Sequence, residues 1–432
     1  MCRRWRQIVF ASPHRLDLRI LCTSKTPVGK NLGIWPALPL SVDFNYHFDW
    51  RDFGNASNED NIIAALEHFD RIREVRLLVT GSELDKITTA MQEPFPVLAS
   101  LHIVSSDFNA PALPTKFSGR SAPGLQEIVL FRIPFPELPT FLLSTSCLVR
   151  LVLGDIPPSG YISPQAMAVG LATLPRLKLF IIGFRSALPR PDRIHSPPVT
   201  RTVLPALTFF HFKGASEYLE DLVTGIDAPQ LKQISIEYLN QLIDLQVTQL
   251  HKFINSSLGL KLTVFKHANI TFYRNRVTFN TSRHSNFQQA DPFPPTTTTI
   301  LCEGIDWQIS HIAHVISQFS ATLSNLVDLK LKVETEWVGP IEGMGDVDWR
   351  HLFQFASVKT LHVSPELAGH VALALEHMVA GELPSIDTIL LEGQLASSIG
   401  KFVATRKLLG RPVTVVDTEA EFDERVKSYV CK

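Results

Sequence analysis

Two histidines three residues apart, His311 and His314, have the side chains and the spacing that a metal ion can use. Both fall in residues 307–319, where apolar residues recur with a helical period, so the pair would share one helix. The apolar residues of that period, expected to form the buried stripe of the helix, are Ile309, Ile312, Val315, Ile316 and Phe319. No third ligand of a suitable type accompanies the pair, and the sequence therefore predicts no metal site.

Two further groups of residues match parts of catalytic motifs. Asp52-Phe53-Gly54 spells the metal-binding triplet of protein kinases, yet no glycine-rich loop, strand lysine or His-Arg-Asp loop accompanies it. A glycine cluster at 339–345 follows no apolar strand and leads into no phosphate-binding helix, which is typical of a surface loop. We therefore expect no enzymatic activity, no catalytic residues and no cofactor.

The strongest pattern in the chain is a repeated phrase: an apolar residue, then Pro-x-Leu or Pro-x-Ile, two more residues and an apolar-x-apolar triplet. The clearest copies occupy residues 95–103, 122–130, 174–182, 204–212, 228–236 and 383–391, with looser copies at 147–153, 323–331 and 355–363. From Leu98 to Leu231 the first leucine of each copy recurs every 23 to 30 residues. This spacing is close to the leucine-rich-repeat period of about 20–29 residues.

The repeated phrase predicts one short strand in each repeat. The last two apolar residues stand two apart, so they share one face of a strand and point into the core. The segment between phrases is long enough for a helix that returns the chain to the same edge, so neighbouring strands run parallel. The sequence therefore predicts an α/β, leucine-rich-repeat-like solenoid with parallel strands and outer helices, in which each repeat is buried by its neighbours.

Capping residues indicate where several of the helices begin and end. Ser82 with Asp85 is interpreted as a capping box, and Ser163 followed by proline as the start of another helix. Gly410 is expected to end a helix over residues 397–409, because glycine readily adopts the left-handed conformation of a C-terminal cap.

One region departs from the repeat. Residues 260–305 alternate with a period of two, which predicts extended strands, and residues 291–299 within them are interpreted as a loop. The predicted domains are an N-terminal helix at 1–14, a cap and linker at 15–60, repeats at 61–259, an irregular strand-rich insertion at 260–305, further repeats at 306–416 and a C-terminal capping helix at 417–432.

The concave face of the predicted sheet is the remaining candidate site. Residues between the core leucines of each phrase point outward, and stacked repeats create extended concave binding surfaces. For a single residue, an ordinary solvated strand face is the simpler interpretation, so only the groove as a whole is assigned to a protein partner. The outward residues are His102, Glu127, Arg150, His211, Gln233, Ser235, Asp328, Lys330, Thr360 and His362.

The N-terminal residues 2–20 read CRRWRQIVFASPHRLDLRI. They resemble the final helix of an F-box, which usually ends Val-Cys-Lys/Arg-x-Trp-x-x-Leu/Ile-x-x-Ser-Pro. The matching positions are Cys2, Arg3, Arg4, Trp5, Ile8, Val9, Ser12 and Pro13. The chain further resembles large fungal families of F-box proteins with divergent leucine-rich repeats, through WRHLFQFASVKTLHV at 349–363 and LLEGQLASSIGKFVAT at 390–405. The alternative interpretation of the N-terminal segment is a hydrophobic capping helix with a solvated arginine face.

In that family the F-box binds the Skp-type adaptor of a cullin-based (SCF) ubiquitin ligase, and the repeats hold the protein substrate. The resemblance thus implies a substrate-recognition subunit, with Cys2, Arg3, Trp5, Ile8 and Val9 as adaptor-binding residues. The chain starts where the third F-box helix would already be under way, so we expect a remnant of the F-box. A lost upstream exon is the favoured explanation, and a receptor without a ligase link is the other. The alternative function is a free-standing leucine-rich-repeat scaffold for protein interactions.

Composition narrows the classes of partner. With 41 basic and 42 acidic residues the net charge is −1, so we expect no nucleic-acid partner. Apolar residues make up 45% of the chain, which predicts an ordered protein with a sizeable core. No stretch reaches the roughly 18 apolar residues of a membrane span, so we expect no membrane partner. Scattered cysteines without paired spacing are typical of reduced thiols, which predicts a cytoplasmic or nuclear protein.

Overall fold

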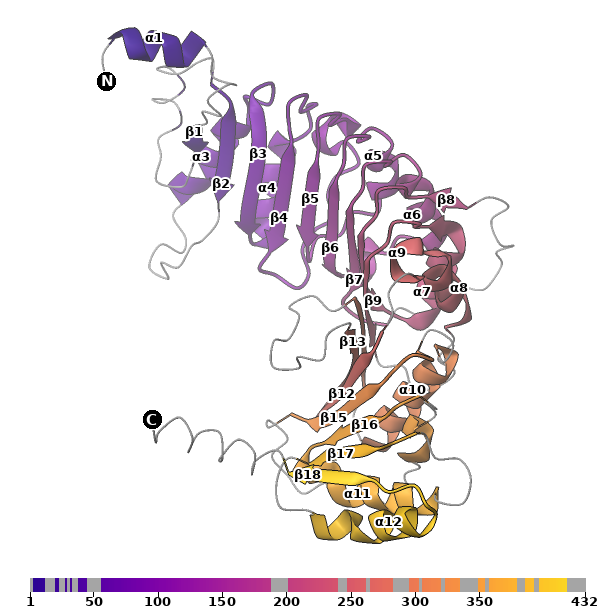
Figure 1. Ribbon diagram of the computed structural model, residues 1–432. Helices are drawn as coiled ribbons and strands as arrows, with labels where there is room; N and C mark the ends of the chain where they lie inside the picture. The colour runs from indigo at the N-terminus through magenta and orange to yellow at the C-terminus, as the bar shows by residue number, and fades with distance from the viewer. Residues whose placement is uncertain are drawn as a thin grey trace. The chain divides into compact units, whose positions relative to one another are not determined.

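The computed structural model of the chain describes residues 3–11, 20–22, 28, 32, 38–44, 56–187, 201–239, 247–261, 265–282, 295–302, 305–319, 323–334, 349–353, 357–378, 385–391 and 396–417. The chain divides into two compact units. Unit 1 comprises Met1–Gly214 with Asp221–Gln230, and unit 2 comprises Ala215–Glu220 with Leu231–Lys432. Both units combine helices with mostly parallel strands, which confirms the predicted mixed α/β class (Figure 1).

Unit 1 alternates strands with short helices along the chain. Its elements are α1 (Arg3–Ala11), β1 (Ile20–Cys22), β2 (Leu40–Phe44), α3 (Ala56–Leu66), β3 (Ile72–Val79), α4 (Gly81–Ala90), β4 (Ser100–Ser105), η2 (Phe117–Arg120), β5 (Glu127–Phe131), α5 (Leu138–Leu142), β6 (Arg150–Ile156), η3 (Pro158–Gly160), α6 (Pro164–Leu171), β7 (Leu179–Phe184), β8 (Thr202–Val203), β9 (Phe209–Gly214) and β10 (Ile226–Asp227). The helix α7 (Ser216–Gly225) contributes residues to both units.

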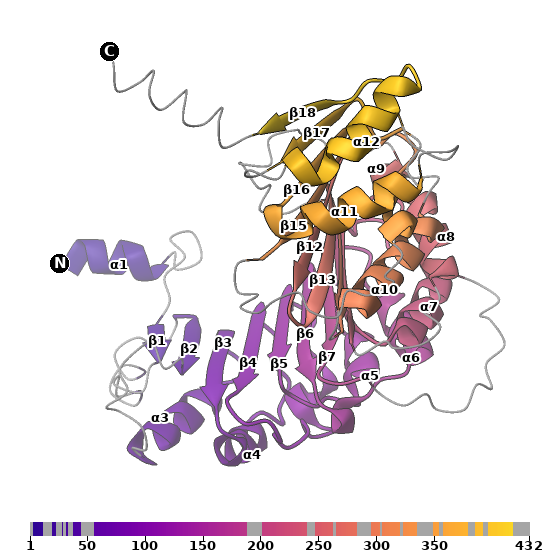
Figure 2. The same cartoon turned by 90° about the horizontal axis from the view of Figure 1, so that it is seen from below.

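The main strands of unit 1 follow one another across the sheet in chain order, β1-β2-β3-β4-β5-β6-β7-β9, and every neighbouring pair is parallel. A separate parallel pair is formed by β8 and β10. The sheet therefore begins before residue 61, within the segment expected to be a cap. Figures 1 and 2 place α3, α4, α5 and α6 on one face of β3–β7. We call the opposite face of the sheet, in either unit, its outer face.

A line of buried core side chains, one from each strand, lies under the helices of unit 1. Leu101, Ile128, Leu151, Phe180 and Phe210 are aligned from β4 to β9 by the parallel register, and each is at most 1% exposed. The rings of the last two stack 5.4 Å apart at an interplanar angle of 14°. Each of these residues occupies the first apolar position of its triplet, so the repeated phrase places one core side chain per strand at the same level.

Two of the predicted helix starts have different outcomes. Ser163 caps α6 as expected, because its side chain accepts a hydrogen bond from the backbone N–H of Ala166 at 3.2 Å. The capping box expected at Ser82 is wrong. Thr80 is the N-cap of α4, and the Glu83 carboxylate accepts from the Thr80 backbone N–H at 2.7 Å. The true box lies two residues earlier because the helix starts directly after β3.

Unit 2 contains a larger share of irregular connections. Its elements are β11 (Gln233–Leu239), α8 (Thr248–Ser256), α9 (Leu258–Lys261), β12 (His267–Tyr273), β13 (Arg276–Ser282), β14 (Thr296–Leu301), α10 (Ile305–Gln318), β15 (Asp328–Val333), η4 (Trp349–Phe353), β16 (Thr360–Val363), α11 (Pro365–His377), β17 (Thr388–Leu391), α12 (Ala396–Leu408) and β18 (Thr414–Asp417). The strand order is β11-β14-β13-β12-β15-β16-β17-β18.

Among these strands of unit 2, β13 is antiparallel to both of its neighbours, and the other pairs are parallel. The extended strands expected within 260–305 are confirmed, but the loop expected at 291–299 is wrong for its last part. Thr296–Leu301 form β14, which pairs with β11 on one side and β13 on the other. Threonine is β-branched and suits a strand, and two ladders satisfy the backbone there.

The C-terminal part of unit 2 matches the sequence pattern closely. The residues of the expected buried stripe, four in α10 and Phe319 directly after it, are each at most 9% exposed. The helix α12 is followed by Gly410, whose φ of 72° is the left-handed conformation expected of a stop. The predicted capping helix at 417–432 lies outside the described residues beyond Asp417, which ends β18.

Candidate protein-binding surface

All ten of the predicted outward residues lie on strands, at positions that alternate with buried core residues. Nine are half-buried, and Arg150 is exposed. His102, Glu127, Arg150 and His211 lie in unit 1 on β4, β5, β6 and β9, whereas Gln233, Ser235, Asp328, Lys330, Thr360 and His362 lie in unit 2 on β11, β15 and β16. Their alternation with the core is as expected, and their role in binding stays a prediction.

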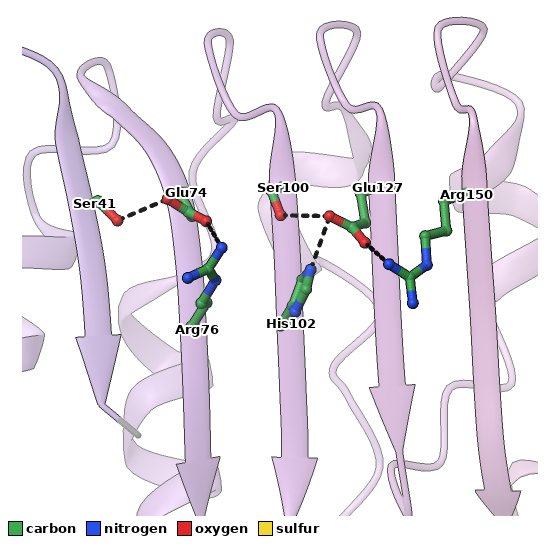
Figure 3. Close-up of polar contacts among 7 residues, drawn as sticks. All are labelled: Ser41, Glu74, Arg76, Ser100, His102, Glu127 and Arg150. Atoms are coloured by element: carbon green, nitrogen blue, oxygen red, sulfur yellow. Dashed lines mark hydrogen bonds and ion pairs between the residues drawn. The ribbon is translucent and has the colours of Figure 1, made fainter. Parts of the chain in front are cut away.

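Three of the predicted residues meet at one carboxylate in unit 1 (Figure 3). Glu127 lies 3.0 Å from His102 Nε2 through its Oε2 and 2.9 Å from Arg150 Nη1 through its Oε1. Ser100 Oγ also donates to Glu127 Oε2, at 3.3 Å. Ser100, Glu127 and Arg150 are aligned across β4, β5 and β6, so the parallel register itself brings them together. We call these four residues the Glu127 cluster.

The Glu127 cluster holds its carboxylate in the ionised form. Burial by itself would raise the pKa of Glu127, but the hydrogen bond from His102 and the charges of His102 and Arg150 outweigh it. The pKa of Glu127 is therefore lowered from its ordinary value. Both oxygens of this carboxylate are occupied, so the cluster fixes neighbouring strands rather than presenting a free acid.

A second carboxylate in unit 1 was not predicted. Glu74 on β3 is 6% exposed and accepts a hydrogen bond from Ser41 Oγ on β2 at 2.9 Å. Its other oxygen pairs with Arg76 on the same strand (Figure 3). The strand β3 carries no Pro-x-Leu phrase, which is why the search for repeats missed it. The alternation of Val75, Leu77 and Val79 was the signal that could have found it.

In unit 2 the predicted residues fall on two paired strands. Asp328 is opposite Thr360, and Lys330 is opposite His362, in the register of β15 with β16. On the other side of β15, His267 of β12 lies opposite Asp328, and its Nδ1 is 2.5 Å from Asp328 Oδ2. His267 is only 8% exposed, so this pair is better shielded from water than the Glu127 cluster. The sequence did not single out His267.

The remaining three predicted residues take separate positions. His211 on β9 lies opposite Ile181, and Ser235 on β11 lies opposite Thr297, with Gln233 at the start of the same strand. The structure therefore distributes the predicted residues over several places on the outer faces instead of gathering them at one point.

The outer face of unit 1 also carries apolar side chains that the polar selection left out. Val129, Val152 and Ile181 are aligned across β5, β6 and β7, and all three are half-buried. We call them the apolar row. Each occupies the middle position of the apolar-x-apolar triplet, so the phrase itself carried the signal.

The residues considered for chemistry are not assembled into a reactive site in the part of the chain that is described. No three His, Cys, Asp or Glu side chains group there as a metal ion would require. His311 is buried with its Nδ1 2.6 Å from the Trp307 carbonyl oxygen, and His314 is exposed. Burial raises the pKa of the Cys302 thiol to about 11, which disfavours the reactive thiolate. Asp52-Phe53-Gly54 and the glycine cluster at 339–345 lie outside the described residues.

The predicted adaptor-binding residues lie on the N-terminal helix α1, apart from Cys2, which is outside the described residues. In α1, Trp5 is 64% and Ile8 is 53% exposed, and Val9 is half-buried. None of the helices that the structure describes has the length and apolar character needed to cross a lipid bilayer.

No protein-family model matches the sequence, and no curated protein matches it.

Proposed function

We propose that this protein is a non-enzymatic protein-binding subunit whose repeats form a leucine-rich-repeat-like solenoid. The observation that carries the proposal is the succession of parallel strands in unit 1, in which the described helices α3, α4, α5 and α6 all lie on one face of β3–β7 and leave the outer face to the strands. Solenoids use such open faces as extended binding surfaces, because each repeat needs only its neighbours for stability. The mixture of fixed charges and the apolar row on this face suits recognition of a protein.

We further propose that the partner is a substrate and that the protein presents it to a cullin-type (SCF) ubiquitin ligase. Support comes from the resemblance of residues 2–13 to the last helix of an F-box and from the exposure of Trp5 and Ile8 in α1. These residues are three apart on a helix, so they share one face. Large apolar side chains gathered on an exposed face indicate an interaction site, here for a Skp-type adaptor.

The ligase link is tested by co-expression of the full chain with a Skp-type adaptor and a cullin, followed by affinity capture. We expect capture of the adaptor to be lost in a Trp5→Ala/Ile8→Ala variant, because both exposed apolar anchors are removed. Arg6→Ala, which changes a neighbouring exposed residue of α1, is the matched control and is expected to keep the adaptor. Failure of the unaltered chain to capture an adaptor would overturn the ligase link.

The alternative is a free-standing leucine-rich-repeat scaffold without a ligase link. It is favoured by the position of the outer face on strands β3–β9, far along the chain from α1, so that partner binding does not depend on the N-terminal helix. The same capture experiment distinguishes the two. A chain that retains a protein partner reproducibly but no adaptor supports the scaffold.

A further inference from the structure

The carboxyl ends of β4, β5 and β7 carry a stack of two arginines and two phenylalanines. The Arg132 guanidinium carbon lies 4.7 Å from the centre of the Phe108 ring and 5.3 Å from that of Phe131. The Arg185 guanidinium carbon lies 4.3 Å from the centre of the same Phe108 ring. All four residues belong to unit 1, and the arrowheads of β5 and β6 in Figure 1 mark this edge of the sheet. We call this group the arginine–phenylalanine stack.

The backbone under the stack adopts conformations that side-chain-bearing residues rarely take. Arg132 has φ 59° and Asp155 has φ 54°, both in the left-handed region. The register of β6 with β7 is also irregular between Leu153 and Ile156. Such a conformation costs on the order of 1 kcal/mol or more for each residue, and strained residues and bulges cluster at binding sites.

Specific contacts fix this strained backbone. The Arg132 backbone N–H donates to the Gly154 carbonyl oxygen at 2.9 Å, and Arg132 Nε donates to Asp155 Oδ2 at 3.1 Å. A Cβ at residue 154 would lie 2.3 Å from the Phe131 ring, so any larger residue than Gly154 would displace that ring. The Phe131 ring therefore lies directly over Gly154 and contacts the Arg132 guanidinium from one side.

The two guanidinium groups retain unused donors. Arg132 uses only its Nε, and Arg185 uses Nη1, which donates to the Phe108 carbonyl oxygen at 2.7 Å. Among the residues that the structure describes, no acceptor meets the remaining N–H groups of either side chain. Arg185 is exposed and Phe108 is 54% exposed, so these donors are accessible from solvent. Asp155 cancels one of the two positive charges, and the stack keeps a single positive charge that suits a carboxylate.

The stack adjoins the apolar row on the outer face. Val129 precedes Phe131 by two residues on β5, so both side chains leave the same face of the strand. We propose that the arginine–phenylalanine stack binds the carboxylate of an Asp or Glu side chain in a protein segment whose apolar residues cover Val129, Val152 and Ile181. This inference rests on the proposed protein-binding function and names the chemistry of the segment that is bound.

The test uses the full chain and a random-peptide display library. Peptides selected by the unaltered protein are expected to be enriched in Asp or Glu close to apolar residues. The affinity of a selected peptide is then measured by fluorescence anisotropy. Replacing its acidic residue by the matching amide is expected to weaken binding about 10-fold or more, the usual effect of losing a charge-assisted hydrogen bond.

Variants of the protein test whether the arginine–phenylalanine stack binds the acidic residue of the peptide. We expect Arg185→Gln and Arg132→Gln each to lower the affinity for the acidic peptide about 10-fold or more. The affinity for the amide version of the peptide is expected to stay unchanged. Arg176→Gln removes an exposed arginine that precedes β7 and is the matched control, expected to have no effect. Asp155→Asn is expected to strengthen binding about 5-fold, because it removes the competing carboxylate. Asparagine tolerates the left-handed conformation, and a gain of affinity cannot come from unfolding.

Several results would overturn the inference. If Arg185→Gln binds the selected peptides as tightly as the unaltered protein, the stack is not the site, while the protein-binding function stands. If replacing the acidic residue by phosphoserine tightens binding more than about 10-fold, the site is one for phosphate instead. If the unaltered chain enriches no peptide, the inference falls together with the proposed binding function.

Discussion

The strands of unit 1 follow one another across the sheet in chain order, whereas unit 2 inserts β14, β13 and β12 between β11 and β15. In unit 1 each strand is followed by a connection that crosses back to the same edge, so only parallel pairs arise. In unit 2 two residues join Tyr273 of β12 to Arg276 of β13, which is enough only for an antiparallel hairpin. The length of the connection, more than the strand sequence, decides the direction of the next strand.

The outer faces of the two units also differ in the side chains that they carry. The apolar row of unit 1 comes from repeat phrases with apolar residues throughout the triplet. The inserted strands of unit 2 present threonine and asparagine instead, and Thr278 bonds across the strands to Thr299 at 3.2 Å. Both units keep the inner alternation that builds a core, so the outer positions are free to differ. We therefore place the proposed partner-binding surface on unit 1.

The largest expected effect comes from removing a core ring in either unit. Phe210 in unit 1 and Phe272 in unit 2 are both fully buried. Changing either to alanine is expected to cost about 3–5 kcal/mol of stability, through lost burial and the cavity left behind. Hydrogen exchange should show lost protection in residues 56–214 for Phe210→Ala and in residues 265–378 for Phe272→Ala. Loss of protection throughout the chain from either change would show one cooperative unit and contradict the division into two units.

A smaller difference is expected between the two carboxylate pairs on the outer faces. Asp328→Asn should cost about 1.5–3 kcal/mol, because it removes the charged partner of His267, which is only 8% exposed. Glu127→Gln should cost at most about 1 kcal/mol, because Arg150 is 50% exposed and its ion pair is weakened by solvent. Urea unfolding of both variants measures the difference. Equal costs would contradict the greater shielding of the unit 2 pair.

The smallest expected effect is a dependence of stability on pH that belongs to Glu127. Because its pKa is lowered in the fold from the ordinary 4.5, its contribution is full above that value. The contribution is lost as the pH falls through the lower folded pKa, since the protonated acid no longer pairs with His102 and Arg150. Urea unfolding at a series of acidic pH values should show a steeper loss for the unaltered protein than for Glu127→Gln. Parallel curves would remove Glu127 as a source of acid sensitivity.

The sequence alone determined the parallel strands that carry the repeated phrase. The apolar-x-apolar triplet has the period of a strand, and burial of its first and last residues leaves one choice of face. It also determined the cap at Ser163 and the stop at Gly410, because these depend on the conformational preferences of single residues. The alternation of polar residues such as His102 and Glu127 with the core followed from the same period.

Only the tertiary structure decided which outward residues meet. Glu127 reaches Arg150 because β5 and β6 align in one register, and His267 reaches Asp328 because the hairpin places β12 beside β15. The strand formed by Thr296–Leu301 and the stacking of Arg132 on Phe108 likewise depend on neighbours distant in the chain. Local preferences act over a few residues, whereas pairing partners are set by how the connections return the chain. The chemistry of a surface that several strands build is therefore not contained in any single repeat.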